Sequence, residues 1–334
     1  MAKRRKRKQL KTGVKRFLIY FVVFLLISIY AYKEGYKIYK QYEYEKTDEY
    51  KIITIGYEKD QAQLMINNLT DEQINFVKDN EYNEMYYKFI PQKYFLSKNY
   101  NKYIDYQKMN PNKDKNKSEE EYLKEIVALV NTHASSGWYN VELDTDTSQG
   151  DTILVNKFYK LNQDYIRDDI VKAQLSYSYA ENSASEKVLL AYKEMRKDVE
   201  DELNVRLMIN SSYRSYEDQQ KVYDERKVIS LKYADSIAAR PGHSEHQTGL
   251  AIDITSLEHP TQKSFTESEE YEWLKNNCHK YGFILRYPEG KENITGYNTE
   301  SWHFRYVGKE TATKIYEEKI TFDEYYAYYI EGNN

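Results

Sequence analysis

The chain has one cysteine, five prolines and twelve glycines in 334 residues, and histidine is scarce too, with six copies. The lone Cys278 excludes an intrachain disulfide and any metal site built from several cysteines. No S-x-x-K tetrapeptide occurs, which excludes the nucleophile-and-base pair of the penicillin-binding serine enzymes. The few histidines are therefore the residues to follow in a search for chemistry.

Acidic and basic residues are nearly balanced in number but unevenly placed. The formal net charge is −4, and residues 1–16 hold nine Lys or Arg and no acid, which leaves 40 basic against 53 acidic residues in the rest. An acidic main body argues against a nucleic-acid partner. Apolar residues make up 40% of the chain, although 37 tyrosines supply part of that fraction. Length and composition predict one sizeable domain with additions, or two modest domains.

One long apolar run lies near the N-terminus. Residues 17–32 are uncharged and follow the basic segment 1–16, which the positive-inside rule places in the cytoplasm. The run is short for a membrane-spanning helix, which needs about 20 residues, and it would also fit the core of a signal peptide. No small-x-small cleavage site follows, so we favour an uncleaved transmembrane anchor. Either alternative places the rest of the protein outside the cytoplasm.

The remaining chain divides by its pattern into successive regions. We expect residues 33–115 to form a stalk and a helical region of unknown role, and residues 116–180 to extend the N-terminus of the domain that follows. That domain spans residues 181–310, where predicted helices and strands alternate, and residues 311–334 are expected to form a C-terminal helix and tail. Within the extension, residues 153–161 are typical of a strand or a buried segment.

The segment Pro241–Thr255, PGHSEHQTGLAIDIT, holds two histidines and an aspartate. On the expected strand, Asp253 shares a face with Ala251, and a carboxylate flanked by isoleucines is costly to bury unless a positive group holds it. Gly249 lets the chain turn and bring His246 and Asp253 onto one centre. Taken alone, this segment favours a structural hydrogen-bonded pair.

A second segment changes that interpretation. Residues 296–308 add Glu300 and His303 at the start of another predicted strand. A catalytic zinc requires three nitrogen or oxygen ligands and an open position, which His246, Asp253 and His303 would supply. Glu300 would then be a free carboxylate, able to take a proton from the attacking water. On a regular strand Glu300 would face away from His303, so the hypothesis requires Glu300 on a loop or bulge just outside the strand.

These two segments resemble the motifs of a known family. Residues 244–253 match the S-x-H-x-x-G-x-A-x-D motif, and residues 300–303 the E-x-W-H motif, of VanY-type D-alanyl-D-alanine carboxypeptidases. The resemblance covers about residues 180–310, and related enzymes include D-Ala-D-Ala dipeptidases and L,D-carboxypeptidases. It implies one Zn²⁺ per chain, with Glu300 as the catalytic base and the metal ligands His246, Asp253 and His303.

The resemblance also implies the fold class. We expect an α+β fold with a small, mostly antiparallel central sheet flanked by helices and with the zinc site at the sheet. A transmembrane helix and a mainly helical membrane-proximal region would precede this domain.

Three further residues are assigned to substrate binding. The segment 212–215 resembles the substrate-binding turn of the family, and Gln219 follows Arg214 by five residues. The guanidinium of Arg214 suits the free carboxylate of a carboxypeptidase substrate, or the oxyanion of the tetrahedral intermediate. Ser244 joins this set on the motif match alone. His243 lies outside the motif and is expected to be a loop residue or a neighbour of the site.

Together these features predict a single-pass membrane protein with a cytoplasmic N-terminus and an extracellular zinc carboxypeptidase domain. Its expected activity is removal of the terminal D-alanine from peptidoglycan stem peptides. An L,D-carboxypeptidase acting on tetrapeptide stems, or a D-Ala-D-Ala dipeptidase, would carry the same motifs. A non-catalytic cell-wall-binding scaffold is the alternative of another class, and the intact ligands and base argue against it.

Overall fold

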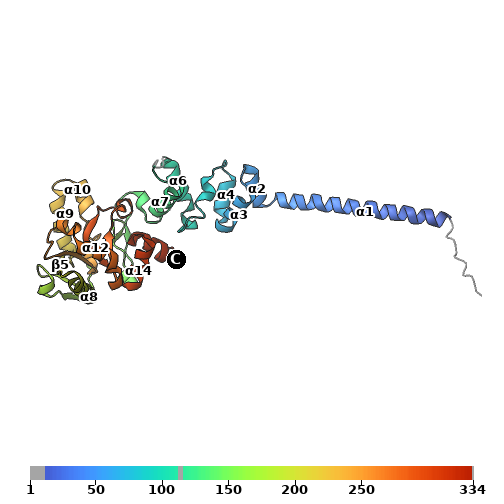
Figure 1. The fold of residues 1–334 in the computed structure, drawn as a ribbon. Coiled ribbons are helices and arrows are strands. Elements are labelled where there is room, and N and C mark those ends of the chain that lie inside the picture. The colour runs from blue at the N-terminus through green and yellow to red at the C-terminus, as the bar shows by residue number, and fades with distance from the viewer. Residues whose placement is uncertain (1–11, 112–115, 333–334) are drawn as a thin grey trace, which may run out of the picture. The chain divides into compact units, whose positions relative to one another are not determined.

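A computed structural model describes residues 12–111 and 116–332 of this chain (Figure 1). The first eleven residues of the expected basic tail therefore lie outside the described residues. The chain divides into two compact units between Pro91 and Gln92.

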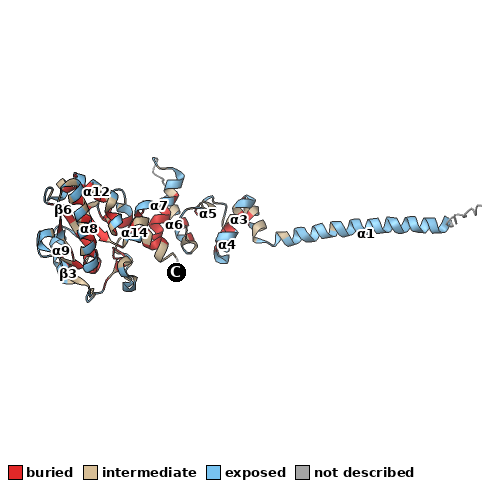
Figure 2. Ribbon diagram, turned by 60° about the horizontal axis from the view of Figure 1, so that its bottom comes forward, coloured by how far each residue is buried: buried red, intermediate tan, exposed pale blue. Residues whose placement is uncertain are grey.

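The first unit begins with one long helix, α1 (Thr12–Glu45), which contains the apolar run 17–32. It continues through the Tyr/Lys/Glu-rich segment, as expected for a helix that extends from a membrane span. No residue of α1 is buried, and the helix is long and apolar enough to cross a membrane (Figure 2).

Short helices complete the first unit. Thr70 caps one of them by accepting a hydrogen bond from the backbone of Gln73, whose side chain closes the capping box. Their buried faces supply a small core that includes Ile52, Met65 and Val77. These helices are α2 (Asp48–Ile55), α3 (Lys59–Asn68), α4 (Asp71–Lys78) and α5 (Met85–Lys88).

The first α-helices of the second unit are α6 (Tyr100–Met109) and α7 (Glu119–Asn131), the latter capped by Ser118. The segment 153–161 is a buried segment rather than a strand. Only its residues Tyr159–Lys160 form a strand, β2, which pairs with β1 (Leu143–Asp144).

Four strands form the central sheet, in the order β5-β6-β8-β7, and every neighbouring pair is antiparallel. The small antiparallel sheet expected for this fold class is therefore present. A second, two-stranded sheet pairs β3 (Ile170–Lys172) with β4 (Ser183–Ser185). The central strands are β5 (Leu207–Ser211), β6 (Ala251–Ser256), β7 (Phe283–Tyr287) and β8 (Glu300–Tyr306).

Helices pack against this sheet and bury its apolar face. Tyr192 and Met195 of α8 join Ile209 of β5 and Ile252 of β6 in one core (Figure 2). Ser215 caps α9, and Gly282 ends the helical run before β7 with a φ of +89°. The helical elements of this part are α8 (Glu186–Leu203), α9 (Tyr216–Lys227), α10 (Leu231–Ile237), η5 (Glu245–Thr248), α11 (Gln262–Thr266), α12 (Glu269–Asn277), η6 (Cys278–Tyr281), α13 (Glu292–Thr295) and α14 (Lys309–Glu318).

The C-terminal segment is more than the helix and tail expected from the sequence. After α14 the chain forms α15 (Phe322–Tyr325) and a π-helical turn, η7 (Tyr326–Ile330). Their aromatic residues do not form a local apolar face, but they pack in a second core with Leu154 and Phe158. This core joins the two ends of the second unit around the sheet.

Candidate metal and catalytic site

The pairing of β6 with β8 places Asp253 directly opposite His303. His246 lies on η5, just before β6, and Gly249 turns the chain between them with a φ of +68°. This positive φ favours glycine, and a Cβ here would also come within 2.2 Å of Cδ1 of Ile170, which would have to shift. The turn returns His246 to Asp253, as the sequence predicted.

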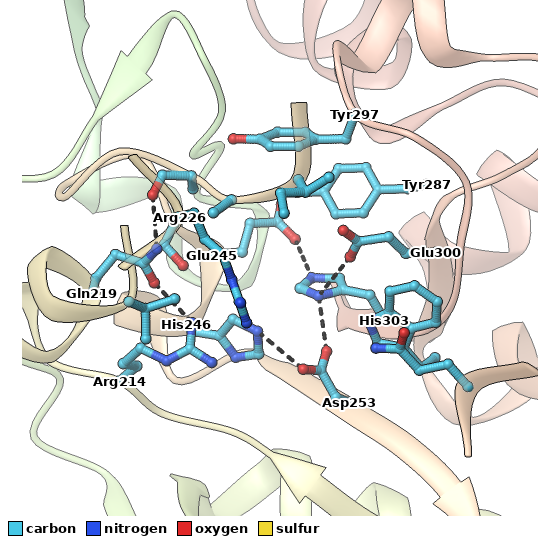
Figure 3. Close-up of a pocket in the computed structure, with 17 residues that line it drawn as sticks. Arg214, Gln219, Arg226, Glu245, His246, Asp253, Tyr287, Tyr297, Glu300 and His303 are labelled. Carbon is cyan, nitrogen blue, oxygen red and sulfur yellow. Dashed lines mark hydrogen bonds and ion pairs between the residues drawn. The ribbon is translucent and has the colours of Figure 1, made fainter. Parts of the chain in front are cut away.

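The three side chains converge at one point (Figure 3). Nε2 of His246 lies 3.6 Å from Oδ2 of Asp253, and Nδ1 of His303 lies 3.1 Å from Oδ1 of Asp253. One ligand atom from each residue lies within 4.8 Å of the others. Oδ1 of Asp253 is buried and makes no hydrogen bond to any residue that the structure describes. Such an oxygen is costly to bury, and a cation held among the three residues would remove that cost.

Each histidine is oriented by a partner on its outer nitrogen. Nδ1 of His246 lies 2.7 Å from the carbonyl oxygen of Ser212 and donates to it, which leaves Nε2 as the inward lone pair. Nε2 of His303 lies 3.4 Å from Oε2 of Glu245, which leaves Nδ1 inward. Partners of this kind fix the tautomer and ring plane of metal-binding histidines. Two imidazoles and one carboxylate, held with an open side, fit a zinc ion.

Burial and charge move the two histidines in opposite directions. Burial lowers the pKa of His246 to about 4, against the opposing charge of Asp253. Burial also lowers the pKa of His303, but the carboxylates of Asp253 and Glu245, which lie beside its two ring nitrogens, outweigh it and raise the value to about 10. Burial raises the pKa of Asp253, yet the two histidines hold it below its usual range. Without metal, His303 therefore carries a proton that a cation must displace.

Glu300 is the first residue of β8, and an irregular strand pairing places it near His303. The register between β7 and β8 shifts between Leu285 and Tyr287, so that Glu300 lies opposite Tyr287. This is the kind of bulge that the hypothesis required. Oε2 of Glu300 lies 3.8 Å from Nδ1 of His303. Burial raises the pKa of Glu300 to about 7, against the charge of His303, and a carboxyl group of this pKa can both take and return a proton.

Arg214 occupies the turn between β5 and α9, where hydrogen bonds hold it in place. Its Nη1 donates to Oε1 of Gln219 at 2.9 Å, and its Nη2 donates to Oγ of Ser211 at 2.8 Å. Its backbone N–H donates to the carbonyl of His246, which ties this turn to the metal ligands. Burial lowers the pKa of Arg214, while Asp253 and other carboxylates oppose that change. The guanidinium is therefore a fixed cation beside the cluster.

A pocket of about 280 Å³ joins these groups. His243 is not among its lining residues: it is buried, and its Nδ1 lies 2.7 Å from the carbonyl of Asn156. All seven residues assigned from the sequence line the pocket, namely Arg214, Gln219, Ser244, His246, Asp253, Glu300 and His303.

Sequence reasoning missed several residues of the site. Glu245 was passed over because it fills a variable position of the motif and resembles a surface acid. The signal that could have found it is the pair Arg286 and Arg305, each within an apolar predicted strand, because a buried arginine needs an acidic partner. The aromatic walls Tyr287, Tyr297 and Trp302 and the rim residue Arg226 were also missed.

Comparisons with known proteins point to one family. A family model described as D-alanyl-D-alanine carboxypeptidase, VanY, matches residues 181–309. YodJ of Bacillus subtilis (strain 168), a carboxypeptidase by provisional name, is 38% identical over 188 residues, which cover 52% of this chain and 66% of YodJ. A D-alanyl-D-alanine carboxypeptidase of Enterococcus faecalis (strain ATCC 700802 / V583) is 35% identical over 219 residues, or 58% of this chain and 76% of that protein.

A solved structure of the LdcB LD-carboxypeptidase, described for its peptidoglycan recognition, is also similar. It matches with a TM-score of 0.53 and 34% identity over 56% of this chain and 90% of that chain. Fold and site together define a hydrolase of the carboxypeptidase class. The chain belongs to the VanY family of D-alanyl-D-alanine carboxypeptidases.

Proposed function

We propose that this protein is a membrane-anchored zinc D-alanyl-D-alanine carboxypeptidase that removes the terminal D-alanine from peptidoglycan stem peptides outside the cytoplasm. The observation that carries the proposal is the buried cluster of His246, Asp253 and His303, whose ligand atoms lie within 4.8 Å of one another beside Glu300. The relative in Enterococcus faecalis, which bears the name of this activity, supports the same substrate class.

The residues of the site divide the chemistry among them. Zinc, when bound to the three ligands, supplies Lewis-acid polarisation of the scissile carbonyl and lowers the pKa of water in the site. Glu300 takes a proton from the water that adds to the last peptide carbonyl. As the C–N bond breaks, Glu300 returns that proton to the amine of the departing D-alanine. Its pKa of about 7 in the metal-free site matches a group that must accept and donate in one cycle.

Arg214 is the substrate-binding cation of this proposal. Gln219 and Ser211 each hold one of its terminal nitrogens, which leaves further N–H groups for an incoming anion. That anion is either the terminal carboxylate of the stem peptide or the oxyanion that forms at the reacting carbonyl. Arg214→Lys separates these roles, because loss of carboxylate binding raises KM while loss of oxyanion stabilisation lowers kcat.

The anchor is the second part of the proposal. The length and apolar composition of α1 support one membrane span. The basic residues that precede it support a cytoplasmic N-terminus, which places the catalytic unit outside.

An L,D-carboxypeptidase acting on tetrapeptide stems is the second candidate. The similarity to LdcB favours it, because the match spans 90% of the LdcB chain and LdcB is named an LD-carboxypeptidase. The same ligands and base serve both reactions, so the walls of the pocket decide between them.

Mass spectrometry of defined muropeptides tests both candidates. The detergent-solubilised full chain with zinc is incubated with pentapeptide and tetrapeptide muropeptides, and loss of one alanine from the pentapeptide is the expected result. Loss from the tetrapeptide alone would assign the L,D activity instead, and no product from either would contradict the proposal. Glu300→Ala is expected to retain zinc and lose D-alanine release, and near wild-type turnover would contradict the assigned base.

A further inference from the structure

A closed set of buried charges lies directly behind the metal cluster. We call Glu245, Arg286, Arg305 and Asp323 the Glu245 network. Their side chains are at most 2% exposed. Oε1 of Glu245 accepts from Nε of Arg286 at 2.7 Å and from Nη1 of Arg305 at 3.1 Å. Two acids and two arginines balance, so no net charge is left buried.

This network reaches the cluster through one atom. Both arginines donate to Oε1 of Glu245. Oε2 of Glu245 lies 3.4 Å from Nε2 of His303 (Figure 3). A carboxylate fixed at this nitrogen keeps the proton on Nε2 and directs the lone pair of Nδ1 to the metal position. It also makes the imidazole a stronger donor to a metal ion.

Asp323 lies beyond the segment 181–309 that matches the family model. It receives Nη1 and Nη2 of Arg286 at 2.6 Å and 3.1 Å, which fixes the guanidinium in a fork. Its Oδ1 also accepts from Nδ2 of Asn156 at 2.7 Å. Residues on both sides of the matched segment therefore hold the arginine that holds Glu245.

Arg305 is held by residues that, like Asn156, precede the matched segment in the sequence. Its Nη2 donates to the carbonyl oxygens of Ile153 at 2.7 Å and Asp151 at 3.0 Å. With these bonds made, Arg305 can move neither toward nor away from Glu245 without leaving a buried donor unpaired.

We propose that Glu245 is a positioning residue for the metal ligand His303, and that Asp323 of the C-terminal segment fixes Glu245 through Arg286. The inference rests on the proposed function in one respect, the assignment of His303 as a zinc ligand. It makes α15 part of the working site rather than a tail.

Zinc affinity of the full chain, measured by competition with a chromophoric chelator, tests the inference. Glu245→Gln is expected to weaken zinc binding by about 10- to 100-fold, because an outer carboxylate partner of a metal-bound histidine has this effect. Asp323→Asn, one step further away, is expected to weaken it by less than about tenfold.

Glu270→Gln is the matched control. Glu270 is a buried carboxylate that holds Nδ1 of His259 at 2.7 Å and is not among the residues that line the metal pocket. Removing its charge is expected to leave zinc affinity unchanged, so the control separates loss of a buried acid from loss of positioning. The visible spectrum of the cobalt(II)-substituted protein gives a second readout, since a rotated His303 alters the ligand field while a global loss of stability does not.

Activity at excess zinc gives a third readout. Glu245→Gln is expected to recover turnover as zinc is raised, whereas Glu300→Ala is not, because only the first variant fails at metal binding. If Glu245→Gln does not fold, Asp323→Asn and the charge-retaining Glu245→Asp decide the question.

Folded variants that bind zinc within about twofold of wild type would overturn the inference. Wild-type protein that binds zinc but releases no D-alanine would contradict the proposed function and leave this inference standing. Wild-type protein that binds no zinc would contradict both.

Discussion

The metal cluster and the Glu245 network are two sets of buried charges in contact with each other, yet they are satisfied to different degrees. In the network each acid receives two or more N–H groups from arginine or asparagine. In the cluster Oδ1 of Asp253 is buried without a hydrogen bond from the described residues, although two histidines lie within 3.6 Å of that carboxylate. A set of buried charges whose hydrogen bonds are all made stabilises the fold. A set with an unsatisfied buried atom indicates a position where a ligand binds.

Proton affinities separate the two sets in the same way. Beside the cluster, burial raises the pKa of Glu300 to about 7, and within the cluster it lowers that of His246 to about 4, so both groups move toward their neutral forms. His303, by contrast, is held charged by the carboxylates next to it. In the network, burial works against the charge of Glu245, but the two arginines hold its pKa well below its usual range. Glu245 thus stays ionised at neutral pH, whereas Glu300 can exchange a proton.

The largest change in stability is expected when the Glu245 network is disrupted. Arg286→Met leaves Glu245 and Asp323 buried without their shared cation and is expected to lower the free energy of unfolding by about 3–5 kcal/mol. Chemical denaturation of the zinc-free protein measures it. Lys197→Met is the control, because it removes only an exposed pair with Asp201 and is expected to leave the free energy of unfolding nearly unchanged. A similar small cost for both variants would show that the network does not stabilise the fold.

A smaller change in the free energy of unfolding, of the opposite sign, is expected beside the cluster. Glu300→Gln removes a carboxylate that is unfavourable to bury, so at pH 8 it is expected to stabilise the zinc-free protein by about 1–3 kcal/mol. The folded-state pKa of about 7 lies above the ordinary 4.5. Below the ordinary value both states are protonated and the variant gains nothing. Its advantage then grows as pH rises and is complete above the folded-state pKa.

Denaturation of wild type and Glu300→Gln across this pH range isolates the effect, since the other titrating groups are common to both. A difference in stability that does not vary with pH, or a less stable variant, would contradict the idea that the catalytic base is held at a cost to the fold.

The smallest expected effect is on KM, and it distinguishes the two arginines of the pocket. Arg226 is exposed at the rim, whereas Arg214 is partly buried and held by two side chains. Arg226→Ala is therefore expected to raise KM by less than about fivefold and to lose that effect at high salt. Steady-state kinetics at two salt concentrations measure it, with Arg214→Ala as the stronger companion. A salt-independent loss at Arg226 would show that it contacts the substrate directly.

Much of the site could be predicted from the sequence because its key residues lie a few positions apart in two short motifs. Gly249 links His246 to Asp253 through a turn that only a small residue allows, and the backbone values agree. Ser215 caps α9 and so places Arg214, again through a local rule. The position of Glu300 was less certain, because the bulge that brings it to His303 depends on the partner strand β7.

The sequence by itself therefore indicated the proposed ligands, the proposed base and the local elements that carry them, because neighbours along the chain decide turns, caps and alternation. Only the tertiary structure decided how His303 is held. Glu245 and Arg305 are 60 residues apart, and Asn156 and Asp323 are 167 apart. Although Arg305 lies in an apolar predicted strand and Asn156 in a predicted buried segment, nothing in the local sequence identifies their partners. Because these side chains are buried, each needs a hydrogen-bonding partner, and the tertiary fold determines which residue supplies it.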